Sequence, residues 1–139
     1  MQSDWRKLTE AEGGVAALGQ QPFGTFAPNF IQRVIIRLAR GSILRRGVFR
    51  SKVTGLILGL GRGMLDIQFR GAAFRLSGER NLIEYGLLLV PEYNRADIDF
   101  LLEDAPEDAV FLDLGCNIGL YSLPLAAAQP KGRVVSIDA

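Results

Sequence analysis

The sequence has 139 residues, of which 48% are hydrophobic and 22% are charged. This length and balance fit one globular domain or part of a larger one, and they exclude a wholly disordered or fibrous chain. The formal net charge is +1, so no strong overall field indicates a nucleic-acid partner. The charge is unevenly divided, because residues 1–62 hold ten Lys or Arg against three Asp or Glu, and residues 63–139 hold six against twelve. We interpret the two stretches as different pieces of architecture.

The chain contains one cysteine, Cys116, and no histidine. A single cysteine cannot form an internal disulfide, which fits a reducing compartment. Without histidine the stretch lacks the usual general base and a common metal ligand, so the sequence predicts no metal site and no histidine-dependent triad. We find no segment with the pattern of a secretory signal or a membrane-spanning helix, and we expect a cytoplasmic location.

Residues 1–62 are predicted to form a basic leader and an amphipathic helix. Residues 1–28 show no steady periodicity and are interpreted as an irregular or partly ordered leader. Asn29 can cap a helix that begins near residue 30 and ends at residues 45–47. We expect its apolar face to be buried and its basic face to be solvated, with contact to a membrane surface or an anionic substrate as the alternative. These faces consist of Ile31, Val34, Ile35 and Leu38, and of Arg33, Arg37 and Arg40.

Residues 63–108 are predicted to contain a hairpin and two helices that precede the core. Alternating apolar and polar residues over 64–76 favour an antiparallel hairpin. Ser77 can cap a helix over about residues 79–89, and Asn94 can cap the next helix. The buried stripe of that next helix is expected to contain Ile98, Leu101 and Leu102.

Residues 109–139 have the pattern of a parallel strand–helix–strand unit. An apolar run over 109–114 is typical of a buried strand, residues 120–129 are expected to be helical, and residues 133–138 form a second strand. Between the first strand and the helix lies the turn Gly-Cys-Asn-Ile-Gly, at residues 115–119. The predicted fold class is therefore α/β.

Two acidic residues stand at the strand ends beside this turn. Gly115 and Gly119 allow a tight turn that a ligand can approach without meeting a Cβ atom. Asp113 lies at the end of the first strand, where its carboxylate can face an amine. Asp138 ends the second strand, where a carboxylate can accept both hydroxyls of a ribose. An ammonium group and a ribose together describe an adenosyl amino acid.

Other interpretations of the same residues stay open. A nicotinamide or flavin dinucleotide requires Gly-x-Gly-x-x-Gly, but the chain has Asn117 and Leu120 at the second and third glycine positions. The turn can also be a plain strand-to-helix connection, and Cys116 a space filler, because no histidine is present to activate its thiol. The glycine-rich run at 59–63 is interpreted as a turn, because no Gly-Lys-Ser/Thr follows it.

The segment Val110-Phe-Leu-Asp-Leu-Gly-Cys-Asn-Ile-Gly-Leu-Tyr-Ser122 resembles the first motif of FkbM-family methyltransferases, which use S-adenosylmethionine (SAM). Upstream, Pro91-Glu92-Tyr93 and the helix after it are similar to the layout of that family. The resemblance implies a Rossmann-like class I methyltransferase fold, preceded here by helical and β-hairpin segments. It also implies methyl transfer from SAM to an acceptor hydroxyl.

The resemblance further implies a set of cofactor residues. The turn would surround the methionine part of SAM, Asp113 would be the motif acid, and Asp138 would hold the ribose. Glu92 matches a recurrent glutamate of the family, and no catalytic residue can be named. The full set is Asp113, Gly115, Cys116, Asn117, Ile118, Gly119, Asp138 and Glu92.

The chain departs from the family at Asp138-Ala139, where the family more often has glutamate and proline. A seven-stranded sheet is implied and two of its strands are present, so we expect the front part of a longer protein that is inactive alone. The expected acceptor is a small molecule or a glycan- or lipid-linked hydroxyl. A non-enzymatic module whose basic helix binds anionic surfaces is the remaining alternative.

Overall fold

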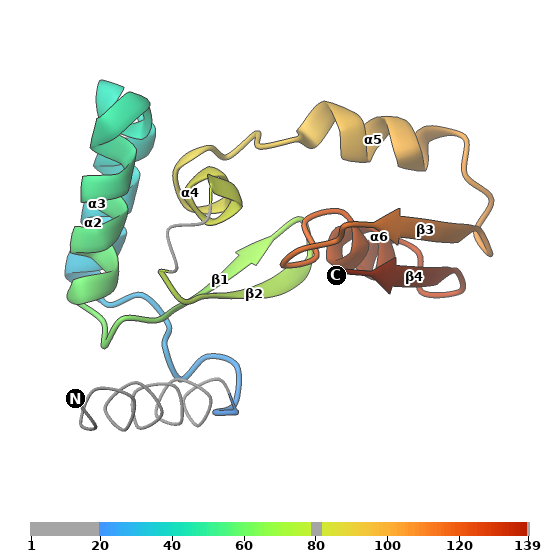
Figure 1. The fold of residues 1–139 in the computed structure, drawn as a ribbon, viewed down its shortest axis with the longest axis horizontal. Coiled ribbons are helices and arrows are strands. Elements are labelled where there is room, and N and C mark those ends of the chain that lie inside the picture. The colour runs from blue at the N-terminus through green and yellow to red at the C-terminus, as the bar shows by residue number, and fades with distance from the viewer. Residues whose placement is uncertain (1–19, 79–81, 139) are drawn as a thin grey trace, which may run out of the picture.

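The computed structural model describes residues 20–78 and 82–138, and shows a mixed α/β chain with two short two-stranded sheets (Figure 1). Residues 1–19 of the predicted leader lie outside the described residues, and residues 20–29 form turns and irregular backbone, as predicted. None of the described helices is long and apolar enough to cross a membrane. In chain order the elements are α2 (Phe30–Arg40), η1 (Ile43–Arg45), α3 (Gly47–Gly59), β1 (Leu65–Phe69), β2 (Ala72–Leu76), α4 (Leu82–Leu89), α5 (Arg95–Glu103), β3 (Val110–Leu114), α6 (Ser122–Ala128) and β4 (Arg133–Ile137).

Helix α2 begins where the sequence predicts and ends earlier. Asn29 and Gln32 cap it reciprocally, because each side-chain oxygen accepts the backbone N–H of the other residue at 2.9 Å. The predicted end at residues 45–47 is wrong, since the helix ends at Arg40 and Gly41 is its C-cap. Glycine is a poor residue for a helix interior, and a separate 3-10 turn, η1, follows it.

The face of α2 that packs inward also differs from the prediction. Ile31 and Leu38 are 59% and 67% exposed, whereas Gln32, Ile36 and Ala39 are buried. Gln32 is buried because its side-chain amide donates to the carbonyl oxygen of Ile57 at 2.7 Å while it also caps the helix. The helix is therefore rotated away from the orientation that its apolar stripe alone would favour.

Helix α3 is absent from the sequence-based prediction, which has no element between the helix end at residues 45–47 and the glycine-rich run at 59–63. Its three glycines and its lack of a clear apolar face hide the helical period. The helix lies alongside α2, and Ile57 and Leu58 enter the core (Figure 1). The residues after Gly59 form a turn, which confirms the interpretation of the glycine-rich run.

The predicted hairpin is present as the antiparallel strands β1 and β2, with Leu65 opposite Leu76. Arg70 and Gly71 connect them, with φ angles of 49° and 81°. Two successive positive φ angles are typical of the tight turns that match strand twist, and glycine accepts that conformation without strain. The apolar side of the hairpin joins one core with the neighbouring helices. Its buried members include Ile36, Ile57, Leu65, Phe69, Phe74, Leu76, Leu87, Leu88, Leu89, Ile98 and Leu120.

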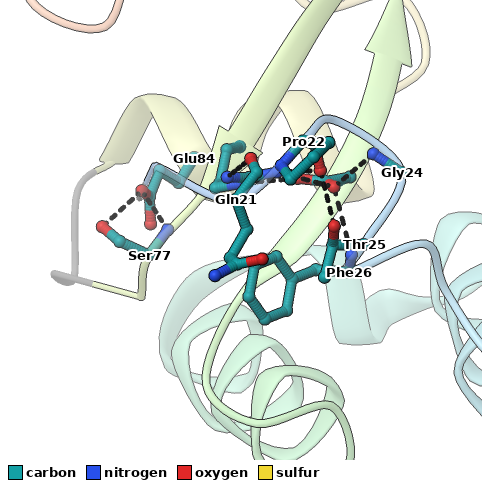
Figure 2. Close-up of polar contacts among 9 residues, drawn as sticks. Gln21, Pro22, Gly24, Thr25, Phe26, Ser77 and Glu84 are labelled. Carbon is teal, nitrogen blue, oxygen red and sulfur yellow. Dashed lines mark hydrogen bonds and ion pairs between the residues drawn. The ribbon is translucent and has the colours of Figure 1, made fainter. Parts of the chain in front are cut away.

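A buried carboxylate organises the connection from β2 to α4. The side chain of Glu84 accepts hydrogen bonds from the backbone N–H groups of Ser77 and Gly78, both at 3.0 Å, and from the Ser77 hydroxyl at 3.3 Å (Figure 2). The Ser77 hydroxyl, which the sequence predicts as a helix cap, donates to Glu84. The predicted helix over 79–89 is observed from Leu82, and residues 79–81 lie outside the described residues.

The strand–helix–strand prediction for the last part of the chain is confirmed. Strands β3 and β4 are parallel, with Asp113 beside Ser136, and α6 lies between them in the sequence. Helix α6 begins at Ser122 rather than at residue 120, and Pro124 lies in its first turn, where no helical hydrogen bond needs its missing N–H. One face of this sheet is open and apolar. It carries the exposed side chains Val110, Leu112, Leu114, Val135 and Ile137.

Candidate functional site

The glycine-bounded turn follows β3 directly and is held against the end of β4. The N–H of Gly115 donates to the carbonyl oxygen of Ile137 at 2.7 Å, and the N–H of Cys116 reaches the same oxygen at 3.4 Å. Because β3 and β4 are parallel, their carboxyl ends lie at one edge of the sheet (Figure 1). Asp138 follows Ile137, so the turn and the second strand-end acid are neighbours at that edge.

The backbone of the turn is satisfied from within the protein. Asn117 has a φ of 48°, in the left-handed region that asparagine tolerates better than most residues. Its side-chain oxygen accepts the N–H of Ile118 at 2.8 Å, and the N–H of Gly119 donates to the carbonyl of Cys116 at 2.8 Å. The amides of residues 115, 116, 118 and 119 therefore all have internal acceptors.

The two glycines have different roles. Both have positive φ angles, 76° at Gly115 and 82° at Gly119. A Cβ atom at Gly119 would lie 2.9 Å from Cγ of Leu123, so this glycine is required by packing as well as by its φ angle. A Cβ atom at Gly115 would meet no atom within 4 Å. Gly115 is therefore the position where a ligand can approach the backbone.

Asp113 is half-buried and bonded to the start of α6. Its Oδ2 accepts a hydrogen bond from the hydroxyl of Ser122, and the Ser122 oxygen lies 2.6 Å from the hydroxyl oxygen of Ser136. This chain of three polar side chains joins both strands to the helix. Within residues 20–78 and 82–138, the other oxygen of the Asp113 carboxylate has no hydrogen-bond partner.

The structure places the predicted residues in different surroundings. Asp138 is exposed at the end of β4, where no ion pair with a described residue holds its carboxylate. Cys116 is half-buried, and Ile118 packs against the core and anchors the turn. Glu92 lies on the surface between α4 and α5, where Arg95 holds its carboxylate at 2.7 Å. The turn and Asp138 therefore lie at the carboxyl end of the sheet, Asp113 lies in β3 next to the turn with its carboxylate bonded to Ser122, and Glu92 is bonded elsewhere.

Sequence reasoning missed a polar contact between α5 and the residue that precedes α6. The phenol of Tyr121 accepts a hydrogen bond from the side-chain amide of Asn94 at 2.6 Å and donates to Asp97 at 3.2 Å. Asn94 occupies the predicted N-cap position of α5, but its side chain makes no capping bond, since its backbone is left-handed (φ 47°) rather than extended. Its side-chain amide donates to Tyr121. Burial raises the pKa of Tyr121, and the bond to Asp97 raises it further, although the bond from Asn94 opposes both.

A cavity of about 320 Å³ lies along β3 beside these groups. Asp113 and Tyr121 are its polar lining residues, and Leu101 of α5 and Leu125 of α6 line it as well. Its volume is near the lower end of the range of about 300–1,000 Å³ that small-molecule sites occupy. In the described part of the chain, no group of three or more His, Cys, Asp or Glu side chains could hold a metal ion.

Comparisons with known proteins give a short local match. A stretch of 33 residues, 24% of this chain, is 54% identical to part of the AMB antimetabolite synthetase AmbE of Pseudomonas aeruginosa. The chain therefore spans about 2% of the length of that curated protein. No family model matches the chain, and no solved structure matches it. None of these comparisons assigns the chain to a family.

Proposed function

We propose that this chain supplies one half of a SAM site in a methyltransferase that resembles the FkbM family. In this proposal the parallel unit β3–α6–β4 is the start of a Rossmann-like class I fold. The main support for it is that backbone N–H groups of the glycine turn already donate to acceptors within the protein. Because the N–H groups of residues 115, 116, 118 and 119 have internal acceptors, the turn offers a ligand carbonyl oxygens and open space rather than phosphate-binding donors.

That property favours a ligand with an ammonium group over a dinucleotide. A pyrophosphate is normally held by free N–H groups of a glycine-rich turn, and Asn117 has taken one of those donors for its own side chain. An ammonium group needs acceptors instead. The unpaired oxygen of Asp113, direct or through water, and the carbonyls beside Gly115 are acceptors of that kind.

The ribose of SAM is assigned to Asp138 because the carboxylate of this residue is exposed. Asp138 carries an exposed carboxylate next to the turn, which suits the two hydroxyls of a ribose. The Ser122 hydroxyl fixes the orientation of Asp113, and Ile118 anchors the turn to the core. SAM, when bound, would supply the activated methyl group for an acceptor hydroxyl on a small molecule, a glycan or a lipid-linked carrier. Glu92 does not contact SAM in this proposal, because its carboxylate is paired with Arg95.

The proposal is tested by calorimetry with S-adenosylhomocysteine, which carries the same ammonium and ribose groups as SAM. We expect the full chain to bind it, and Asp138→Ala to weaken binding about tenfold or more, since a carboxylate that accepts two hydroxyls is lost. Asp108→Ala removes an exposed acid from the loop before β3 and is the matched control. Binding of NAD in place of S-adenosylhomocysteine, or equal losses in both variants, would overturn the proposal.

A further inference from the structure

A second cavity, of about 490 Å³, shares no lining residue with the glycine turn. It lies between α2, β1 and α4. One side of α2 forms its first wall, residues 66–68 of β1 form the second, and Leu88 of α4 closes it. The basic face of α2 is solvated as the sequence predicts, since Arg33 and Arg37 are exposed and Arg40 is half-buried, and the same face lines this open cavity.

Three arginines of α2 line this cavity together. Arg33, Arg37 and Arg40 are spaced by four and three residues, which places them on one side of the helix. Nε of Arg33 donates to the carbonyl of Pro28 at 2.8 Å, and Nε of Arg40 donates to the carbonyl of Leu88 at 2.9 Å. These bonds anchor the side chains of Arg33 and Arg40 through Nε and leave the two terminal nitrogens of each guanidinium for another acceptor.

No carboxylate of the described residues is paired with these three arginines. Asp66 lines the cavity, but its carboxylate is taken by Arg75 and by two backbone N–H groups. Arg40 is half-buried, and burial lowers the pKa of its guanidinium. Like charges on one helix face and a partly desolvated cation are both unfavourable until an anion is present.

We propose that this cavity binds a ligand through a phosphate or diphosphate group, which the guanidinium groups of Arg33, Arg37 and Arg40 hold. A guanidinium matches the oxygen spacing of phosphate and forms paired, charge-assisted hydrogen bonds with it. One carboxylate can satisfy a single guanidinium in this way, whereas the oxygens of a phosphate or diphosphate can satisfy three. The volume lies within the range of small-molecule sites, so an organic group attached to the phosphate also has room.

Calorimetric titration of the full chain with inorganic pyrophosphate at low ionic strength tests this site. We expect saturable binding that Arg37→Gln weakens about tenfold, because one set of charge-assisted hydrogen bonds is lost. Arg37 is chosen because its guanidinium bonds to no described residue, so its replacement removes no hydrogen bond or ion pair within the described fold. Arg46→Gln removes the same charge from an exposed position outside the cavity and is the control. Circular dichroism melting checks that both variants remain folded.

Unchanged affinity in Arg37→Gln, or equal weakening in both variants, would overturn the site, since general charge attraction depends on net charge alone. Vesicles with and without phosphatidic acid then distinguish the source of the phosphate. Binding to phosphatidic acid vesicles that pyrophosphate displaces assigns the group to a lipid headgroup, and pyrophosphate binding without vesicle binding assigns it to a soluble ligand. Vesicle binding that pyrophosphate does not displace counts against the cavity. Asp138→Ala should leave pyrophosphate affinity unchanged, which separates this result from that for the SAM proposal.

Discussion

Asp66 and Arg75 face each other across the hairpin and form an ion pair through two separate contacts. Nε of Arg75 lies 2.7 Å from Oδ1 of Asp66, and Nη2 lies 3.0 Å from Oδ2. Oδ2 also accepts the backbone N–H groups of Gly24 and Phe26, at 2.7 and 3.1 Å. The guanidinium in turn donates to the backbone carbonyls of residues 21 and 22, so the pair joins this irregular segment to the sheet.

Replacing this buried carboxylate should be costly. The strand pattern predicted Asp66 on the polar face of the hairpin, but it is only 4% exposed because residues 21–26 cover it. Asp66→Asn leaves Arg75 without its counter-charge and replaces one of the two acceptor oxygens with a donor NH2 group, so we expect a loss of about 2–3 kcal/mol in the free energy of unfolding. Urea denaturation measures it. Asp99→Asn, which weakens exposed ion pairs with two arginines, should cost less than about 1 kcal/mol. Equal losses in the two variants would contradict the prediction.

The same carboxylate predicts the direction of the pH dependence. Burial alone raises the pKa of Asp66, but hydrogen bonds from Arg75, Phe26 and Gly24 outweigh it and hold the pKa below the ordinary value of 3.8. The folded state therefore favours the ionised form. Its contribution to stability is complete above the ordinary value and is lost as the pH falls through the lower pKa of the folded state.

Unfolding free energies measured between about pH 6 and about pH 2 test this sign. The wild-type chain should lose more stability over this range than Asp66→Asn, since the variant has no carboxyl group to protonate there. Parallel curves for the two proteins would show that Asp66 has the same pKa in the folded and unfolded states.

The elements that sequence reasoning predicted are those whose pattern is local. The hairpin and the strand–helix–strand unit carry their periods and turn residues within short stretches, so their existence follows from the chain itself. The orientation of α2 depends on Gln32, whose amide bonds to the carbonyl of Ile57, 25 residues away. The period of the apolar residues carries no information about that contact. Gln32 is buried together with Ile36 and Ala39, so the helix is rotated away from the orientation that its apolar stripe predicts.

The two glycines of the turn predict different mutant behaviour. Gly115→Ala places a methyl group in open space but strains a φ angle of 76°, so we expect a loss of about 1–2 kcal/mol in stability. Gly119→Ala adds a clash with Leu123 to the same kind of strain and should destabilise the chain more. Thermal melting of both variants gives this order.

Binding should show the opposite order for the variants that stay folded. Because the space beside Gly115 is where the proposed ligand approaches, Gly115→Ala should weaken S-adenosylhomocysteine binding even after correction for the unfolded fraction. Leu123→Ala in the Gly119→Ala background should recover part of the lost stability by removing the clashing atoms. A larger stability loss in Gly115→Ala than in Gly119→Ala would show that the space beside Gly115 is filled.

Only those residues of the candidate site that lie close to the glycine turn, or at the end of the next strand, could be predicted from the sequence. The spacing of the glycines and the strand-end acids is enough to place Asp113, Gly115 and Asp138 at one edge of the sheet, where they are observed. The role of Tyr121 was not predicted, because its hydrogen-bond partner Asn94 lies 27 residues upstream and was interpreted as a helix cap. The left-handed backbone at Asn94, which prevents the cap, and the bond from its amide to Tyr121 both depend on the folded chain and not on the local pattern.

The bond between Asn94 and Tyr121 gives the last prediction. Tyr121→Phe keeps the ring that packs against the core but removes the hydroxyl that accepts from Asn94 and donates to Asp97. Both partners have access to water, so we expect a loss of about 1–2 kcal/mol in unfolding free energy rather than a collapse of the fold. Tyr93→Phe is the control, because the Tyr93 ring packs beside Gly86 and its hydroxyl bonds to no described residue. If Tyr93→Phe costs as much as Tyr121→Phe, the link from α5 to the glycine turn contributes no stability of its own.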